Sequence, residues 1–194
     1  ERNDSAADRI EFIHHLSLTG DDDALAEALL SEGRILVKAG HTELLSILND
    51  LDKNDFETRV WGMIRTLRGD ILSIQGRWDE AEVEYDAATK HVSDSKDGVD
   101  LARLLSSRAD IALKRGAMDD ALELHRKALG IQISIRDARG AARSYINMGY
   151  IFRRRRDTRH ALEVYGNVEE LLNSEDSSEL SDARIRLASA FIEM

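Results

Sequence analysis

The stretch YINMGYIF at residues 145–152, followed by ALEVY at residues 161–165, decides how this chain folds. Forty residues earlier the corresponding segments are LSSRADIA and ALELH, and forty residues before those they are RTLRGDIL and AEVEY. Self-similarity at one fixed spacing is typical of stacked supersecondary units. The sequence therefore predicts an array in which each unit contacts its neighbours and offers a long surface to other macromolecules.

The residues that recur at matching places are explained by two packed helices in each unit. One position on the first helix needs a small residue because the two helix axes approach closely there. An alanine stands at the facing position on the second helix. An aromatic residue wedges between units, and a glycine ends the first helix in the left-handed conformation. These structural residues are Gly69, Ala109 and Gly149, then Ala81, Ala121 and Ala161, then Tyr85 and Tyr165 with His125 at the same place, and the turn residues Gly76 and Gly116.

This pattern resembles the tetratricopeptide repeat family, whose helix–turn–helix unit reads W-x-x-L-G-x-x-Y and then A-x-x-x-F. The resemblance covers residues 56–193 and implies an all-α fold, a right-handed superhelical solenoid of antiparallel helix pairs. The third copy departs from the family at its turn, where Arg156 replaces the glycine and Thr158-Arg159-His160 replaces an acidic pair. The family's usual repeat is about 34 residues long, so the 40-residue spacing predicts a long-period variant.

The chain divides into two expected parts. Helical periodicity in residues 1–54 predicts an N-terminal segment that contains a degenerate repeat, with helices at 5–18, 22–39 and 42–52. Residues 55–194 hold the tetratricopeptide-like repeats, which we place at about 56–95, 96–135 and 136–175, with a half-repeat at 176–194.

Part of the N-terminal segment carries a second resemblance. From His15 to Leu48 it is similar to the helical entry to the superhelical arm of signal-transduction ATPases, such as the maltose-regulator type of transcription activator. The resemblance implies that the arm is the sensor of a nucleotide-driven switch. The chain contains no G-x-x-x-x-G-K-[ST] phosphate loop, so this reading places the ATPase elsewhere in a longer protein.

Both ends of the chain look cut, since it begins at Glu1 and its last predicted helix, 178–193, has no second helix after it. Such a helix would leave Ile185, Ala188 and Ile192 uncovered. Exposed apolar patches mark contact sites. We therefore expect the terminal helix to dock against a second copy as a homodimer, or to fold back on its own repeat.

Composition excludes several classes of partner and compartment. The net charge of −10 disfavours nucleic acid as the chief ligand. The chain has no cysteine, which removes disulfide and thiolate chemistry and is compatible with a cytoplasmic location. No apolar run approaches the roughly 18 residues that a membrane-spanning helix needs. We expect a cytoplasmic protein that contacts no membrane.

No motif for catalysis or for cofactor binding is present. The sequence lacks a nucleophile elbow, a zinc spacing and a dinucleotide fingerprint. Glu11-x-x-His14 has the spacing of half a di-iron site, but the second half is missing. We therefore expect no catalytic residue, no metal ligand and no cofactor, and we predict that the protein is not an enzyme.

The candidate ligand site is the concave wall that the first helices should form. Its expected exposed places include Met63, Thr66, Asp70, Ser73, Ser106, Leu113 and Ile146. The predicted ligand-binding residues on this wall are Arg103, Asp110, Arg143, Asn147, Tyr150 and Arg153. A Lys/Asn carboxylate clamp, as found in some members of the family, is excluded because Thr66 and Asp70 stand at its places in the first repeat.

Arginine dominates the charge around the third repeat. Residues 136–160 hold eight arginines against Asp137 and Asp157, a local charge of +6. Arginine grips carboxylates through paired hydrogen bonds, which favours an acidic peptide or helix as the ligand. The alternative is structural, because cations in the last turn of a helix also offset its dipole.

Two functions remain open from the sequence. The first is a non-catalytic scaffold for protein–protein interaction that binds a peptide or helix of a partner on its concave face. The second is a sensor or regulatory arm of a nucleotide-dependent signal-transduction ATPase or transcription regulator.

Overall fold

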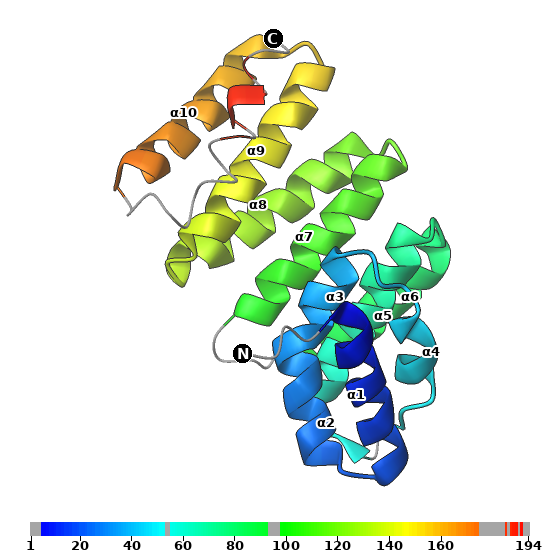
Figure 1. Cartoon of the computed structure of the whole chain (residues 1–194). Coiled ribbons are helices and arrows are strands. Elements are labelled where there is room, and N and C mark those ends of the chain that lie inside the picture. The colour runs from blue at the N-terminus through cyan, green and yellow to red at the C-terminus, as the bar shows by residue number, and fades with distance from the viewer. Residues whose placement is uncertain are drawn as a thin grey trace. The chain divides into compact units, whose positions relative to one another are not determined.

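The computed structural model of the chain describes residues 5–52, 55–92 and 98–174, and residues 185, 187–189 and 191 near the C-terminus. These residues form helices and turns and no strand (Figure 1). They fall into two compact units, Glu1–Ser95 and Lys96–Met194, which are described separately below.

The N-terminal unit begins with short helices. These are α1 (Ala6–Thr19), α2 (Asp22–Ala28), the π-helical turn η1 (Leu29–Gly33), α3 (Arg34–Lys38) and α4 (Leu44–Asn49). The first hairpin, α5 (Thr58–Ile74) and α6 (Trp78–Val92), completes the unit. The helical stretches predicted at 5–18 and 22–39 are confirmed, whereas the stretch predicted at 42–52 is shorter in the structure.

Local chemistry explains where the first helices begin. The Ser5 hydroxyl accepts a hydrogen bond from the backbone N–H of Asp8, and the Asp8 carboxylate accepts one from the N–H of Ser5. This reciprocal capping box satisfies donors that have no partner within the helix. Asp21 caps α2 by accepting from the N–H of Ala24 at 3.1 Å.

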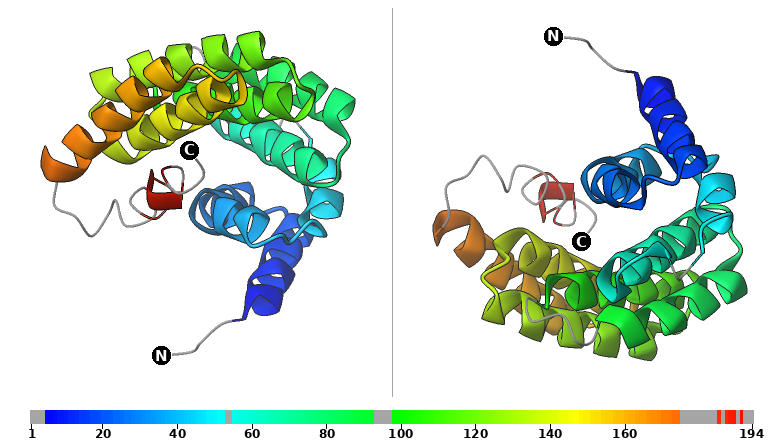
Figure 2. Two further views of the ribbon diagram at one scale, coloured as in Figure 1. Left: turned by 90° about the horizontal axis from the view of Figure 1, so that it is seen from above. Right: turned by 90° about the horizontal axis from the view of Figure 1, so that it is seen from below.

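The C-terminal unit contains two further hairpins. These are α7 (Val99–Lys114) with α8 (Met118–Ser134), and α9 (Ala138–Arg154) with α10 (Thr158–Ser174). Each helix packs on the next one in the chain, and Figure 2 shows the four side by side. The predicted all-α, solenoid-type fold of paired helices is confirmed. The second helices of the three hairpins begin at Trp78, Met118 and Thr158.

Two glycines lie directly against the aromatic rings of their own hairpins. A Cβ built on Gly69 would lie 2.4 Å from Cε1 of Tyr85, and one built on Gly149 would lie 2.2 Å from Cε1 of Tyr165. No carbon side chain fits at such distances. The small residue on the first helix and the aromatic residue on the second are therefore one packing feature, used in both units.

The recurring alanines also lie at helix crossings. Ala81, Ala109, Ala121 and Ala161 are all fully buried. The core of the C-terminal unit is then filled by larger residues such as Ile151, Val168 and Tyr165. At 25 cal/mol per Å², burial of such side chains contributes about 1.5–3 kcal/mol each.

The first-to-second helix turns share one backbone conformation but not one residue. Gly76 and Gly116 adopt φ of 76° and 79°, and Arg156 adopts φ of 59° at the same place in the third hairpin. Arg136, between α8 and α9, has φ of 58°. Left-handed backbone strains residues that carry a Cβ, so these two arginines hold an unfavourable conformation.

The N-terminal segment does not stand apart from the first hairpin. Helices α3 and α4 both pack on α5 within the Glu1–Ser95 unit. The boundary predicted between residues 54 and 55 therefore does not coincide with the division into compact units, and the predicted domain scheme stays a prediction.

The predicted terminal helix, 178–193, lies largely outside the described residues. Its described part shows Leu187 buried in the core of the C-terminal unit, and Phe191 packed edge-on against Tyr165 at 5.6 Å between ring centroids. Ile185 is 66% exposed. The described part thus contacts its own unit, and Ile192 is not among the described residues.

Candidate protein-interaction face

The predicted ligand-binding residues come from two helices of the C-terminal unit. Helix α7 carries Arg103 and Asp110, which are two helical turns apart. Helix α9 carries the other four, at spacings of three and four residues that place them along one helix face: Arg143, Asn147, Tyr150 and Arg153. Their exposed or partly exposed side chains form what we call the α7–α9 face.

A hydrogen bond joins the two helices across this face. Nδ2 of Asn147 donates to Oδ1 of Asp110 at 3.3 Å, although 37 residues separate them in the chain. Asp110 is exposed and Asn147 is partly exposed. The pair therefore offers a carboxylate and an amide, at one point, to any peptide that approaches.

The two arginines predicted to form a basic stripe have different surroundings. Arg103 pairs with Asp100 on its own helix, at 3.4 Å between Nη1 and Oδ1. Arg143 is exposed and forms no ion pair with any residue that the structure describes. Arg143 thus has its charge available for a ligand carboxylate.

Tyr150 fixes two guanidinium groups at the end of α9. The guanidinium carbons of Arg153 and Arg154 lie 5.5 and 5.8 Å from the centroid of the Tyr150 ring. Nη1 of Arg154 also donates to the Tyr150 hydroxyl at 3.2 Å. Stacking on an aromatic ring holds the planar guanidinium in place, which reduces the ordering that an anion must impose when it binds.

A fully buried histidine lies beneath the α7–α9 face. His125 of α8 occupies the place of Tyr85 and Tyr165, and its Nε2 lies 4.0 Å from Oδ1 of Asp110. Burial, together with a smaller effect of the positive charge of Arg143, lowers the pKa of His125 to about 4. The imidazole is therefore neutral at pH 7. The sequence placed His125 in the core but did not show that it lies beside two site residues.

The first hairpin has a pair equivalent to His125 and Asp110, and it shows which sequence signal could have predicted their contact. The Tyr85 hydroxyl donates to Oδ1 of Asp70 at 2.6 Å. Asp70 and Asp110 hold the same place in their repeats, as do Tyr85 and His125. An aspartate at this place with a polar ring fifteen residues later therefore marks a contact between the two helices of a hairpin.

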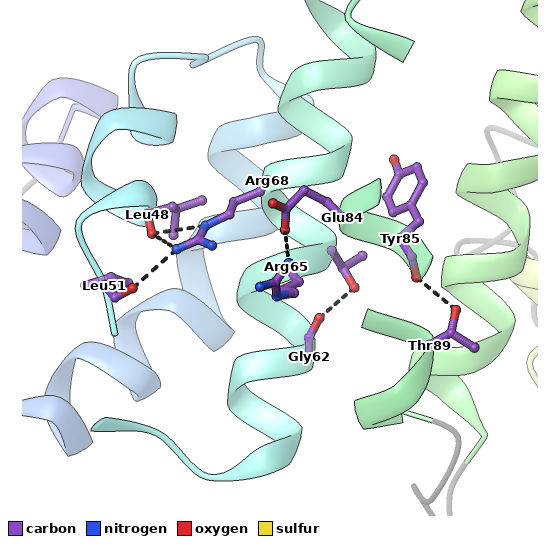
Figure 3. A network of polar contacts seen from close by, with 9 residues as sticks. Leu48, Leu51, Gly62, Arg65, Arg68, Glu84, Tyr85 and Thr89 are labelled. Carbon is purple, nitrogen blue, oxygen red and sulfur yellow. Dashed lines mark hydrogen bonds and ion pairs between the residues drawn. The ribbon is translucent and has the colours of Figure 1, made fainter. Parts of the chain in front are cut away.

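The first hairpin contains a polar network that the sequence did not reveal (Figure 3). The buried guanidinium of Arg68 donates to the carbonyl oxygens of Leu48, in the last turn of α4, and of Leu51, just after the helix ends. It also stacks over the Trp61 ring at 4.9 Å. Burial lowers the pKa of Arg68. This residue joins α4 to α5 and is structural.

Arg65 belongs to the same network and also lies against Trp61. Its guanidinium lies 5.5 Å from the Trp61 ring centroid and pairs with Glu84 of α6 at 3.2 Å. The two arginines and the tryptophan thus connect α4, α5 and α6 within the N-terminal unit.

Several residues expected on the exposed wall are buried instead. In α5 they are Met63, Thr66 and Ser73, and in the other first helices they are Ser106 and Ile146. The prediction was wrong here for a physical reason. The hydroxyls of Thr66 and Ser106 donate to carbonyls four residues earlier, and α3 and α4 cover part of α5. The open part of the predicted wall is therefore the α7–α9 face.

The described ranges show neither a membrane-spanning helix nor a cluster of metal ligands. Among them no helix has both the length and the apolar character that crossing a bilayer requires. The same ranges contain no group of three or more histidine, cysteine or acidic side chains placed so that they could hold a metal ion.

Paired helices with a recurring small-residue and aromatic contact define a helical-repeat protein. The sequence model of the tetratricopeptide repeat matches residues 62–134 and 100–174, which together span more than half of the chain. The chain belongs to the tetratricopeptide repeat family. Such repeats generally mediate protein–protein interaction, and proteins built from them are typically non-catalytic scaffolds.

Among solved structures, the chain is similar to the crystal structure of BtubC (BKLC) from P. vanneervenii. The two share 18% sequence identity with a TM-score of 0.65, over 96% of this chain and 80% of that one. At this identity the similarity concerns the fold. No curated protein matches the chain.

Proposed function

We propose that this protein is a non-catalytic scaffold that binds a peptide or helix of a partner protein on the α7–α9 face, the open part of the expected concave wall. The observation that carries the proposal is the Asn147–Asp110 hydrogen bond, which sets a donor and an acceptor beside exposed Arg143. A peptide backbone offers amide groups that match the first pair, and a carboxylate matches the arginine.

Charge supports an acidic segment as the ligand. Arg143 forms no ion pair with a carboxylate among the residues that the structure describes, whereas Arg103 is already paired with Asp100. Tyr150 holds Arg153 in a stacked position at the end of the same face. A ligand carboxylate that reaches Arg153 meets a guanidinium whose position is already restricted, which favours specific over diffuse attraction.

The test is affinity purification from an extract of the source cells, with three forms of the protein as bait. The wild type and Arg126→Gln, which removes an exposed charge from α8, should retain the same proteins. Arg143→Glu with Asn147→Ala should lose them while the helical circular dichroism stays unchanged. Equal retention by all three forms refutes the α7–α9 face as the binding site.

The alternative function is a sensor arm of a nucleotide-dependent signal-transduction ATPase or transcription regulator. It rests on the resemblance of residues 15–48. This alternative predicts a phosphate-binding loop encoded in the same gene, and a gene without one refutes it.

Two finer features belong to the same proposal. We infer that the repeats are a 40-residue variant of the family unit, since matched residues such as Ala81, Ala121 and Ala161 keep that spacing. We also place the protein in the cytoplasm, in accord with its lack of cysteine. A homodimer through the terminal helix stays a prediction, to be tested by sedimentation at several concentrations.

A further inference from the structure

A second charged surface lies at one end of the C-terminal unit, at the turns rather than along the helices. Four exposed arginines end α9 and begin α10: Arg154, Arg155, Arg156 and Arg159. Nη2 of Arg155 reaches Oδ1 of Asp119 at 2.7 Å and so joins this turn to the start of α8. Figure 1 shows the α7–α8 and α9–α10 turns at the same end of their hairpins. We call Arg154, Arg155, Arg156 and Arg159 the arginine edge.

The neighbouring turn adds to the positive charge. Lys114 and Arg115, at the end of α7, are both exposed. The carboxylates of the two turns are partly engaged, since Asp119 binds Arg155 and Asp157 binds the His160 ring at 2.7 Å. This edge is therefore positive in a chain whose net charge is −10.

The backbone conformation of Arg156 indicates that its side chain has a function at this position. Arg156 has φ of 59°, at the place where the other two hairpins carry Gly76 and Gly116. A Cβ at either glycine would meet nothing within 4 Å, so the turn itself gives an arginine no packing role. Glycine would relieve the strain. Strain that persists without a structural reason points to a functional one.

The offset of the helix dipole does not require an arginine at this place. Arg153 and Arg154 already stand in the last turn of α9, where cations act on the dipole. The α7–α8 hairpin has glycine at the same turn and only Lys114 in the last turn of α7. The guanidinium of Arg156 forms no ion pair with the residues described here.

We propose that the arginine edge is a second interaction surface, separate from the α7–α9 face, that binds an acidic segment of a partner protein. The edge consists of arginine rather than lysine, and arginine binds carboxylates through paired, directional hydrogen bonds. Arg154 is held by Tyr150 and Arg155 by Asp119, so two of the four guanidiniums are already positioned. An extended nucleic acid or an anionic membrane would also face the rest of a chain whose net charge is −10, whereas a short acidic segment contacts only the arginine edge.

The test uses fluorescence anisotropy with labelled decaglutamate as the probe and decaglutamine as its uncharged counterpart. The wild type should bind decaglutamate, with an affinity that falls as salt rises, and should not bind decaglutamine. Arg156→Gly should raise the melting temperature by about 2–4 °C, as relief of strain predicts, and weaken decaglutamate binding on the order of threefold or more. The triple change R154Q/R156Q/R159Q should weaken it at least about tenfold.

Two controls separate this surface from the proposed α7–α9 face. Arg126→Gln removes one exposed charge from α8 and should bind decaglutamate within about twofold of the wild type. R103Q/R143Q removes only the share of the probe that binds the α7–α9 face, so adding R154Q/R156Q/R159Q to it should still weaken binding at least about tenfold. The edge proposal is overturned if R156G binds as well as the wild type, if R103Q/R143Q loses the probe instead, or if duplex DNA or phosphatidylserine vesicles bind and decaglutamate does not. The extract experiment changes only Arg143 and Asn147 and leaves the arginine edge intact, so failure of the edge proposal and failure of the α7–α9 face give different results.

Discussion

Asn147 of α9 donates a hydrogen bond of 3.3 Å to Asp110 of α7, and this contact connects the first helices of two successive hairpins at the surface. Both side chains are at least partly exposed, so their mutual attraction is weakened by water. We expect Asp110→Ala to change the free energy of unfolding by less than about 0.5 kcal/mol. The same variant should weaken partner binding, because the face loses its carboxylate.

Glu123→Gln is the matched control for that change, since it removes an exposed carboxylate from α8, where Glu123 pairs with Lys127. It should leave both stability and partner affinity unchanged. A large loss of stability in Asp110→Ala, measured by urea denaturation, would instead make Asp110 a structural residue.

Replacing Gly149 with alanine should destabilise the protein. The new Cβ would lie 2.2 Å from Tyr165 Cε1, so the ring or the helix must move. Overpacking of this kind costs about 1–3 kcal/mol. Gly130→Ala is the control, because a Cβ there meets nothing within 4 Å on α8, and it should stabilise by about 0.5–1 kcal/mol. Opposite shifts of the two urea midpoints are expected, and equal shifts would contradict the assigned packing.

Arg68→Gln should loosen the end of α4. The change leaves the carbonyls of Leu48 and Leu51 without the guanidinium that they now accept from, and a buried unsatisfied group costs about 1–3 kcal/mol. Hydrogen exchange should therefore speed up in residues 44–52. Arg77→Gln is the control, because Arg77 is exposed and pairs only at the surface with Glu80, at 2.6 Å. It should leave hydrogen exchange in residues 44–52 unchanged. Unchanged exchange in Arg68→Gln would show that α4 is held by other contacts.

His125 should make stability depend on pH. Its pKa is about 4 in the folded protein against 6.5 when unperturbed, so the unfolded state binds a proton first as pH falls. Stability is therefore complete above about pH 6.5 and declines toward pH 4, with a loss of about 2 kcal/mol at pH 5. His125→Tyr, which restores the aromatic residue of the other hairpins, should remove that part of the decline. Parallel pH profiles for the two proteins would rule out His125 as its source.

The helices were predictable from the sequence because their signals are local. Apolar periodicity places α5 to α10, and glycines at turns such as Gly76 and Gly116 mark where the first helices end. The π-helical turn at Leu29–Gly33 was not predictable, because the apolar spacing on either side of it reads as one continuous helix.

Contacts between helices were harder to predict. Arg68 reads as an ordinary helix residue, and its partner Leu48 is 20 residues away. Thr66 and Met63 were expected on an open wall, but that expectation treated α5 as the start of the array and ignored the packing of α3 and α4 on it. The candidate residues on α7 and α9 follow helical spacings that the sequence shows, and their role in binding stays a prediction. The buried imidazole beneath them belongs to α8, and only the folded packing of the three helices brings it there.

The most direct measurement of the central claim is site-specific photocrosslinking in an extract of the source cells. A benzophenone amino acid would replace Arg143 on the α7–α9 face in one protein, and Arg126 on α8 in another; both positions are exposed. Binding on the α7–α9 face predicts defined protein adducts from position 143 and none from position 126. Adducts from position 126 alone would contradict the account and place the binding surface on the second helices.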